Sequence, residues 1–238
     1  MLEVIGHKAL GILSDYILSK FKNFVIDKWS SYRVNVFLNT LCKELIVSSS
    51  NVLENDVKKM IDEIINDDIK SEILFESYRK VFMSASKNIG PRVIAILTSK
   101  IISENRIATQ YEEQMFLVSE SLIDLELKEL GNFLNENLYS YDNNKGIVYI
   151  EIDKEQVDLN REYEIQILDL TEFYGVWAVK AKNLGIICDT LKESVSRYYE
   201  DSERHIDEDG TIKTFTWNIR VNTTFKEFGE LIKKSSYD

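Results

Sequence analysis

The chain has 238 residues, of which 29 are basic and 40 acidic, so its net charge is −11 at neutral pH. An apolar fraction of 44% excludes an intrinsically disordered chain, and the negative charge disfavours generic nucleic-acid binding because phosphate is repelled. A single proline and only nine glycines exclude a flexible linker between two halves.

The character of the sequence changes near residue 140. Residues 1–123 carry 16 acidic and 15 basic side chains and follow helical periodicity. Residues 124–238 carry 24 acidic and 14 basic side chains and include strand-like runs. Cys42 and Cys188 lie far apart, which favours two reduced thiols over one long-range disulfide. Without a signal peptide or an uninterrupted apolar stretch of 18 residues, the expected location is cytoplasmic.

The first predicted helix covers residues 4–28, and its apolar stripe spans more than half of the circumference. Such a helix needs cover on more than one side. Three interpretations stay open, namely packing into a bundle, docking of a partner or second copy, and binding to a membrane surface beside Lys20, Lys22 and Lys28. The candidate partner-binding residues are Leu10, Leu13, Ile17, Phe21, Phe24 and Trp29.

Further helices are predicted up to residue 137. Gly90 and Pro91 are expected to end one helix and begin the next, because proline is tolerated in a first turn. Thr109 followed by Glu112 predicts a capping box, and Asp124 is expected to cap the helix that follows it. The expected helices cover residues 31–47, 71 up to the Gly90-Pro91 pair, 92–105, 110–119 and 125–137. A further helix, capped by Asn51 or Asn55, is expected to end near residue 68.

Beyond residue 140 the pattern predicts a small α/β module. Thr171 is expected to cap a helix through Asn183, which Gly185 ends. Asp209 and Gly210 have the chemistry of a hairpin turn. The other expected elements are a turn at 143–146, strands at 147–152 and 214–221, and a last helix over 225–234 capped by Thr223 or Thr224.

No catalytic, cofactor-binding or metal-ligating residue is assigned. Two histidines exclude a multi-histidine metal site, and no phosphate-cradling glycine loop or nucleophile motif occurs. Residues 205–216 do not match an EF-hand calcium-binding loop, because His205 and Thr216 occupy its first and last positions, where carboxylates are required. A non-enzymatic protein without a cofactor is therefore predicted, although an acid/base pair among the many carboxylates stays open.

Residues 71–131 and two later segments resemble the abortive-infection alpha group of bacterial proteins. The segment VKAKNLGII at 179–187 is similar to the helix of that group that closes on LGLI. VNTTFKEFGELI at 221–232 is similar to its C-terminal motif, but departs from it by placing four residues between Thr224 and Gly229. The resemblance implies a role in defence against phage and assigns no catalytic residue.

Together these observations predict a mainly α protein with a helical bundle over residues 1–122 and a winged-helix-like α/β module over 123–238. The leading functional hypothesis is an interaction or regulatory protein that contacts a protein partner or a second copy of itself. One alternative is a DNA-binding regulator whose recognition helix is 171–183, provided that Arg197, Arg204 and Arg220 gather on one side. The other is a membrane-surface effector that uses the first helix.

Overall fold

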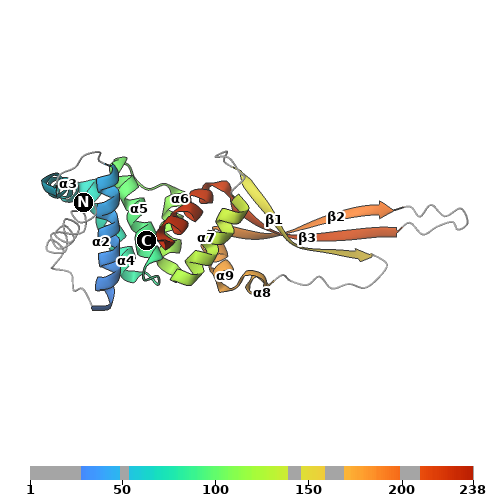
Figure 1. The fold of residues 1–238 in the computed structure, drawn as a ribbon. Helices are drawn as coiled ribbons and strands as arrows, with labels where there is room; N and C mark the ends of the chain where they lie inside the picture. The colour runs from blue at the N-terminus through green and yellow to red at the C-terminus, as the bar shows by residue number, and fades with distance from the viewer. Residues whose placement is uncertain (1–27, 49–53, 139–145, 159–168, 199–209, 238) are drawn as a thin grey trace, which may run out of the picture. The chain divides into compact units, whose positions relative to one another are not determined.

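The computed structural model describes residues 28–48, 54–138, 146–158, 169–198 and 210–237. Within these ranges the chain is mainly helical and carries one small antiparallel sheet (Figure 1). It divides into a helical unit, formed from residues 1–135 together with 227–238, and a sheet unit of residues 136–226. The division thus falls inside a helix, later than the expected boundary at 122, and the last helix joins the first unit.

The helical unit contains seven helices among the described residues. They are α2 (Lys28–Ser48), α3 (Glu54–Asn66), α4 (Asp68–Met83), α5 (Ile89–Ser103), α6 (Gln110–Ser121), α7 (Asp124–Leu138, whose last turn belongs to the sheet unit) and α10 (Lys226–Ser236, beginning at the boundary). None of the described helices is both long enough and apolar enough to cross a bilayer.

Helix α5 forms the centre of the helical unit, because α2, α4 and α6 all contact it. Twelve of its fifteen residues are buried, as expected for a helix that is apolar on every side. Its buried Thr98 hydroxyl lies 2.7 Å from the Ile94 carbonyl and 2.8 Å from the Ser77 hydroxyl, so it is fully hydrogen-bonded. Helix α2 contributes a stripe at heptad-like spacing, consisting of Val34, Phe37, Leu38, Leu41, Cys42 and Leu45.

Several predicted helix ends are shifted in the structure. Asp67 caps α4, which begins at Asp68 instead of the expected residue 71 and ends at Met83, well before the Gly90-Pro91 pair. Pro91 lies in the first turn of α5, as expected, but Gly90 also belongs to that helix. A Cβ atom at Gly90 would lie 2.3 Å from the Ser119 carbonyl oxygen, so close packing against α6 explains the glycine there.

Helix α10 packs on α7 at two glycines. A Cβ atom at Gly131 would lie 2.6 Å from a methyl group of Ile232, and one at Gly229 would lie 2.9 Å from Cβ of Leu134. Asn135 donates hydrogen bonds to the carbonyls of Gly131 and Gly229, at 2.6 and 2.9 Å. The missing side chains therefore allow the two helix backbones to approach closely.

The sheet unit contains β1 (Ile147–Asp158), β2 (Ile187–Tyr198) and β3 (Gly210–Asn222), with β3 between the other two. Helices α8 (Leu170–Tyr174) and α9 (Val176–Asn183) connect β1 to β2, and a 3-10 turn (Thr223–Phe225) follows β3. The strands extend well past the predicted ranges because pairing with β3 continues through polar residues.

Local signals explain the connections in the sheet unit. Asp169, rather than Thr171, caps α8, and Gly175 at φ +89° divides the single helix that was expected there. Gly185, at φ +77°, ends α9 as predicted. The amides of Gly185 and Ile186 donate to Lys182 and Ala181, which is the Schellman pattern of a glycine-stopped helix.

Candidate interaction surface

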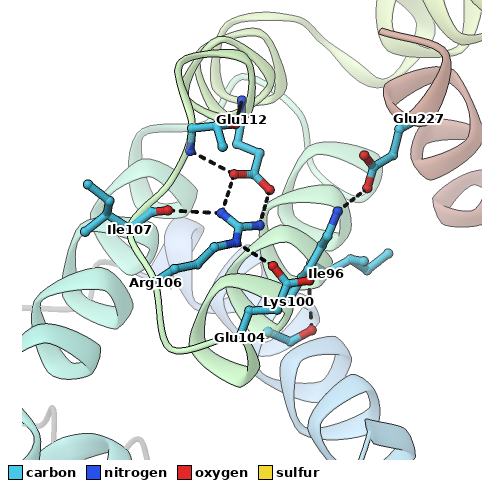
Figure 2. A network of polar contacts seen from close by, with 9 residues as sticks. Ile96, Lys100, Glu104, Arg106, Ile107, Glu112 and Glu227 are labelled. Carbon is cyan, nitrogen blue, oxygen red and sulfur yellow. Dashed lines mark hydrogen bonds and ion pairs between the residues drawn. The ribbon is translucent and has the colours of Figure 1, made fainter. Parts of the chain in front are cut away.

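Arg106 is the centre of a polar network that fastens the loop between α5 and α6 (Figure 2). Its guanidinium donates two hydrogen bonds of 2.6 Å to the Glu112 carboxylate, and it also contacts Glu104. Glu112, which is 6% exposed, accepts a further bond of 2.8 Å from the Thr109 amide and completes the predicted capping box. Each polar group of this network is engaged in holding the loop.

The charge of Glu112 is stabilised by these partners. Burial by itself raises the pKa of a carboxyl, but the hydrogen bonds from Arg106 and Thr109 outweigh it and lower the pKa of Glu112 to about 2. The same contacts raise the pKa of Arg106 above its ordinary value. Both groups stay charged, so this network is a structural clamp on α6 and offers no proton for exchange near neutral pH.

Asp124 forms a second network at the beginning of α5. Its carboxylate accepts hydrogen bonds from the Asn88 and Ile89 amides at 3.1 and 2.9 Å, from the Lys87 amide and from the Ser86 hydroxyl. Burial opposes the charge, but these four donors lower the pKa of Asp124. Asp124 was expected to cap the helix that follows it in sequence, yet here it caps a helix that begins 35 residues earlier.

The two cysteines have different surroundings. Cys42 is 1% exposed in the core stripe of α2, and burial raises the pKa of its thiol to about 12, which keeps it protonated. Cys188 lies on β2 beside Arg220. Within the described ranges, no group of three or more His, Cys, Asp or Glu side chains is placed to hold a metal ion.

The sheet has one face that is packed at its Val148 and Val221 end, called here the packed face, and one face that is open. Residues opposite each other on paired strands share a face, and Val148, Ile187, Ile219 and Val221 on the packed face are at most 5% exposed. On the other face Tyr149 is 60% exposed. We call this side the open face, and its residues include Tyr149, Glu151, Lys154, Cys188, Thr190, Lys192, Ser194, Thr216, Asn218 and Arg220.

A β-bulge at Ile152 decides which charges reach the open face. Glu151 pairs with Asn218 and Asp153 with Trp217, so Ile152 is an extra residue and the alternation of β1 reverses there. The reversal puts Lys154 on the open face and puts Asp153 and Glu155 on the packed face.

Charge is therefore separated between the two faces of the sheet. Among the described side chains, the open face carries three basic residues, Arg220, Lys192 and Lys154, against Glu151. The packed face carries Lys213 against four acidic residues, namely Asp153, Glu155, Asp189 and Glu193. A chain with a net charge of −11 thus presents one locally positive surface, on which hydroxyl and amide side chains are joined by Cys188 and the exposed Ile147.

Arg220 forms the middle of a row across the three strands, with Cys188 on one side and Tyr149 on the other. Interaction with Cys188 first, and with Tyr149 second, raises the pKa of Arg220. The row combines a forked cation with an exposed aromatic ring, and both contribute strongly to recognition of partners.

The structure leaves most of the predicted site residues undescribed. Leu10, Leu13, Ile17, Phe21 and Phe24 lie outside the described residues, and Trp29 lies in α2 with a side chain that is not described. The surface predicted on the first helix therefore stays a prediction.

The arginines expected to gather for DNA binding are far apart or undescribed. Position 197 of β2 lies opposite Thr211 and Arg220 lies nine residues further along β3, a separation of roughly 30 Å at ~3.3 Å per residue. Arg204 lies outside the described residues. In contrast, Tyr149, Lys154 and Lys192 of the open face were not among the predicted site residues; for Lys154 the reason is that no alternation rule reveals a bulge in a single sequence.

Comparison with known proteins gives no relative for this chain, since no family model, no curated protein and no solved structure matches it.

Proposed function

We propose that the protein is a non-enzymatic interaction protein and that the open face of its sheet receives an acidic segment of a partner protein. The observation that carries the proposal is the separation of charge, which puts Arg220, Lys192 and Lys154 on one exposed polar surface. Complementary charge determines orientation and speeds association, and an arginine fork matches a carboxylate in two hydrogen bonds.

The spacing of the cations suggests an extended ligand. Lys192 lies opposite Thr216, four residues from Arg220 along β3, which separates the two positions by ~13 Å. An extended peptide covers the same distance in four residues, so acidic residues at positions i and i+4 would reach both cations. Tyr149 lies beside Arg220 on β1, on the side of β3 away from Lys192, and offers apolar surface to the peptide at its Arg220 end.

Binding of a fluorescent peptide with that acidic spacing tests the proposal. We expect the full chain to bind it, the double variant Arg220→Gln with Lys192→Gln to lose at least tenfold in affinity, and added salt to weaken the wild-type complex. Lys213→Gln is the matched control, because Lys213 lies on the packed face beside Glu193. No binding, or an equal loss in the control, would contradict the proposal.

A winged-helix regulator of DNA is the second candidate. The order α7, β1, α8, α9, β2, β3, with β3 between β1 and β2, supports this finer fold. The charges support it less, since Lys182 of α9 pairs with Asp189 at 2.7 Å and residues 199–209 contain six acidic residues. Retention on heparin at ~0.15 M salt would favour DNA over a protein partner.

The roles in phage defence and at a membrane surface remain predictions. The first rests on the resemblance of residues 71–131, 179–187 and 221–232 to abortive-infection alpha proteins, and the second on the apolar face expected over residues 4–28. Flotation of the full chain with anionic liposomes tests the second, with Phe21→Glu as the variant that should stay in solution.

A further inference from the structure

The two outer strands of the sheet are protected to different degrees. Strand β1 carries the bulge at Ile152, and its twelve residues contain four acidic side chains and one lysine. Strand β2 pairs with β3 over twelve consecutive positions without a bulge, and its two acidic and two basic residues cancel. Bulges and an excess of one charge are the means by which proteins prevent unwanted pairing of edge strands.

Apolar side chains mark the outer edge of β2. Leu191 and Val195 are 48% and 55% exposed. No strand of the described residues pairs with this edge, because β3 is the partner on its other side. A long, regular, neutral edge with exposed apolar residues is a surface on which a further strand can pair.

We propose that β2 pairs antiparallel with β2 of a second copy of this chain, on a two-fold axis through Glu193. Such an axis places residue 193 opposite residue 193 of the second copy. A residue a given number of positions before 193 then lies opposite the residue of the second copy that is the same number of positions after 193. Leu191 then lies opposite Val195 of the second copy, and Asp189 lies opposite position 197, an arginine. This register pairs eleven residues, from 188 to 198, and within it matches one apolar residue with another, Leu191 with Val195, and one acidic residue with a basic one, Asp189 with position 197.

Neighbouring registers are less favourable. An axis through Lys192 would set Leu191 opposite Glu193, and one through Ser194 would set Val195 opposite Glu193, each placing an apolar side chain against a carboxylate. With the axis at Glu193, the two glutamates face each other, but Lys213 lies 2.8 Å from the carboxylate within each copy and offsets the repulsion.

The dimer would contain one continuous sheet of six strands. A two-fold axis perpendicular to the sheet keeps the open faces of both copies on the same side, so Lys192 of each copy would flank a shared surface. The inference does not depend on what the open face binds. The residues that decide its test, Leu191, Glu193 and Val195, lie off that face, whereas the background change at Cys188 and the control at Ile147 lie on it.

Cysteine cross-linking of the full chain tests the register. In a Cys188→Ser background, Glu193→Cys should form a disulfide-linked dimer under mild oxidation, because only the residue on the axis meets its own copy within bonding distance. Val195→Cys is the matched control and should stay monomeric on a denaturing gel, since its copy would lie ~13 Å away. A dimer from the control, or none from Glu193→Cys, would overturn the register.

Light scattering tests the edge itself. The wild-type chain should be dimeric, and the double variant Leu191→Asp with Val195→Asp should be monomeric, because each new carboxylate would face another. Ile147→Asp, a substitution at a 51% exposed position on β1, should leave the dimer intact. Circular dichroism should show all three proteins folded. A monomeric wild type, or a double variant that stays dimeric, would overturn the proposal.

Discussion

Replacing Glu112 by glutamine should remove the charge of the α5–α6 clamp while keeping a side chain that can still cap the helix. The pKa of Glu112 is about 2 in the folded protein against 4.5 for an ordinary glutamate. That difference corresponds to about 3 kcal/mol of stability at neutral pH, by the conversion of 1.36 kcal/mol per pH unit. Because the Arg106 side chain is 29% exposed, solvent screening reduces our expectation to about 2 kcal/mol.

The dependence on pH follows from the sign of the shift. A folded-state pKa below the unfolded value stabilises the fold above the unfolded pKa, and this stabilisation is lost as the pH falls from about 5 towards 2. Urea unfolding of the wild type and of Glu112→Gln, followed by circular dichroism at several pH values, measures it. The gap between the two proteins should be largest at neutral pH and should close near pH 2.

A matched control is the exposed pair of Glu76 and Arg79, which lies on one face of α4 with an N–O distance of 2.8 Å. Glu76→Gln should cost less than about 0.5 kcal/mol because exposed helical pairs contribute little. If Glu112→Gln costs no more than this control, or if its effect does not change with pH, the charge of Glu112 does not stabilise the clamp and the reasoning is refuted.

Three further predictions concern single residues of the helical unit. Asp124→Ala should lower the free energy of unfolding by about 2 kcal/mol, because four donors at the beginning of α5 lose their acceptor; thermal unfolding measures this, and an unchanged melting temperature would contradict it. Gly229→Ala should lower the free energy of unfolding by about 1–3 kcal/mol, because its Cβ would meet Leu134 at 2.9 Å. In the same urea unfolding measurement, Glu230→Ala, a change at an exposed neighbouring residue, should lower it far less. Cys42, whose pKa is about 12, should resist a thiol reagent in the folded protein and react once urea unfolds it, so rapid native labelling of Cys42 would argue against its burial.

The sequence predicted helices best where the deciding contacts are local. The Thr109–Glu112 capping box and the Gly185 stop are confirmed because each depends on residues within one or two turns. Asp124 shows where local reasoning fails. The same side chain suits a cap for the next helix or for one distant in sequence, and only the packing of the helical unit brings it to α5.

The extent of the strands could not be derived from apolar alternation alone. The expected strand ended at Ile152, the residue at which the bulge occurs, and the polar half of β1 continues because β3 supplies hydrogen bonds. The open face depends on that bulge, so no spacing rule could assign Lys154 to the same side as Arg220. The apolar face predicted on the first helix rests on residues outside the described ranges.

The return of α10 to the helical unit determines the order in which the fold can be completed during synthesis. The ribosome makes α2 to α7 first, then the whole sheet unit, and only afterwards the helix that covers Gly131 and Leu134 of α7. Until then the α7 surface that meets Ile232 is uncovered. The helical unit therefore lacks its last helix while the sheet unit can already fold. A nascent chain arrested before residue 227 should therefore expose apolar surface to chaperones even when its sheet is complete.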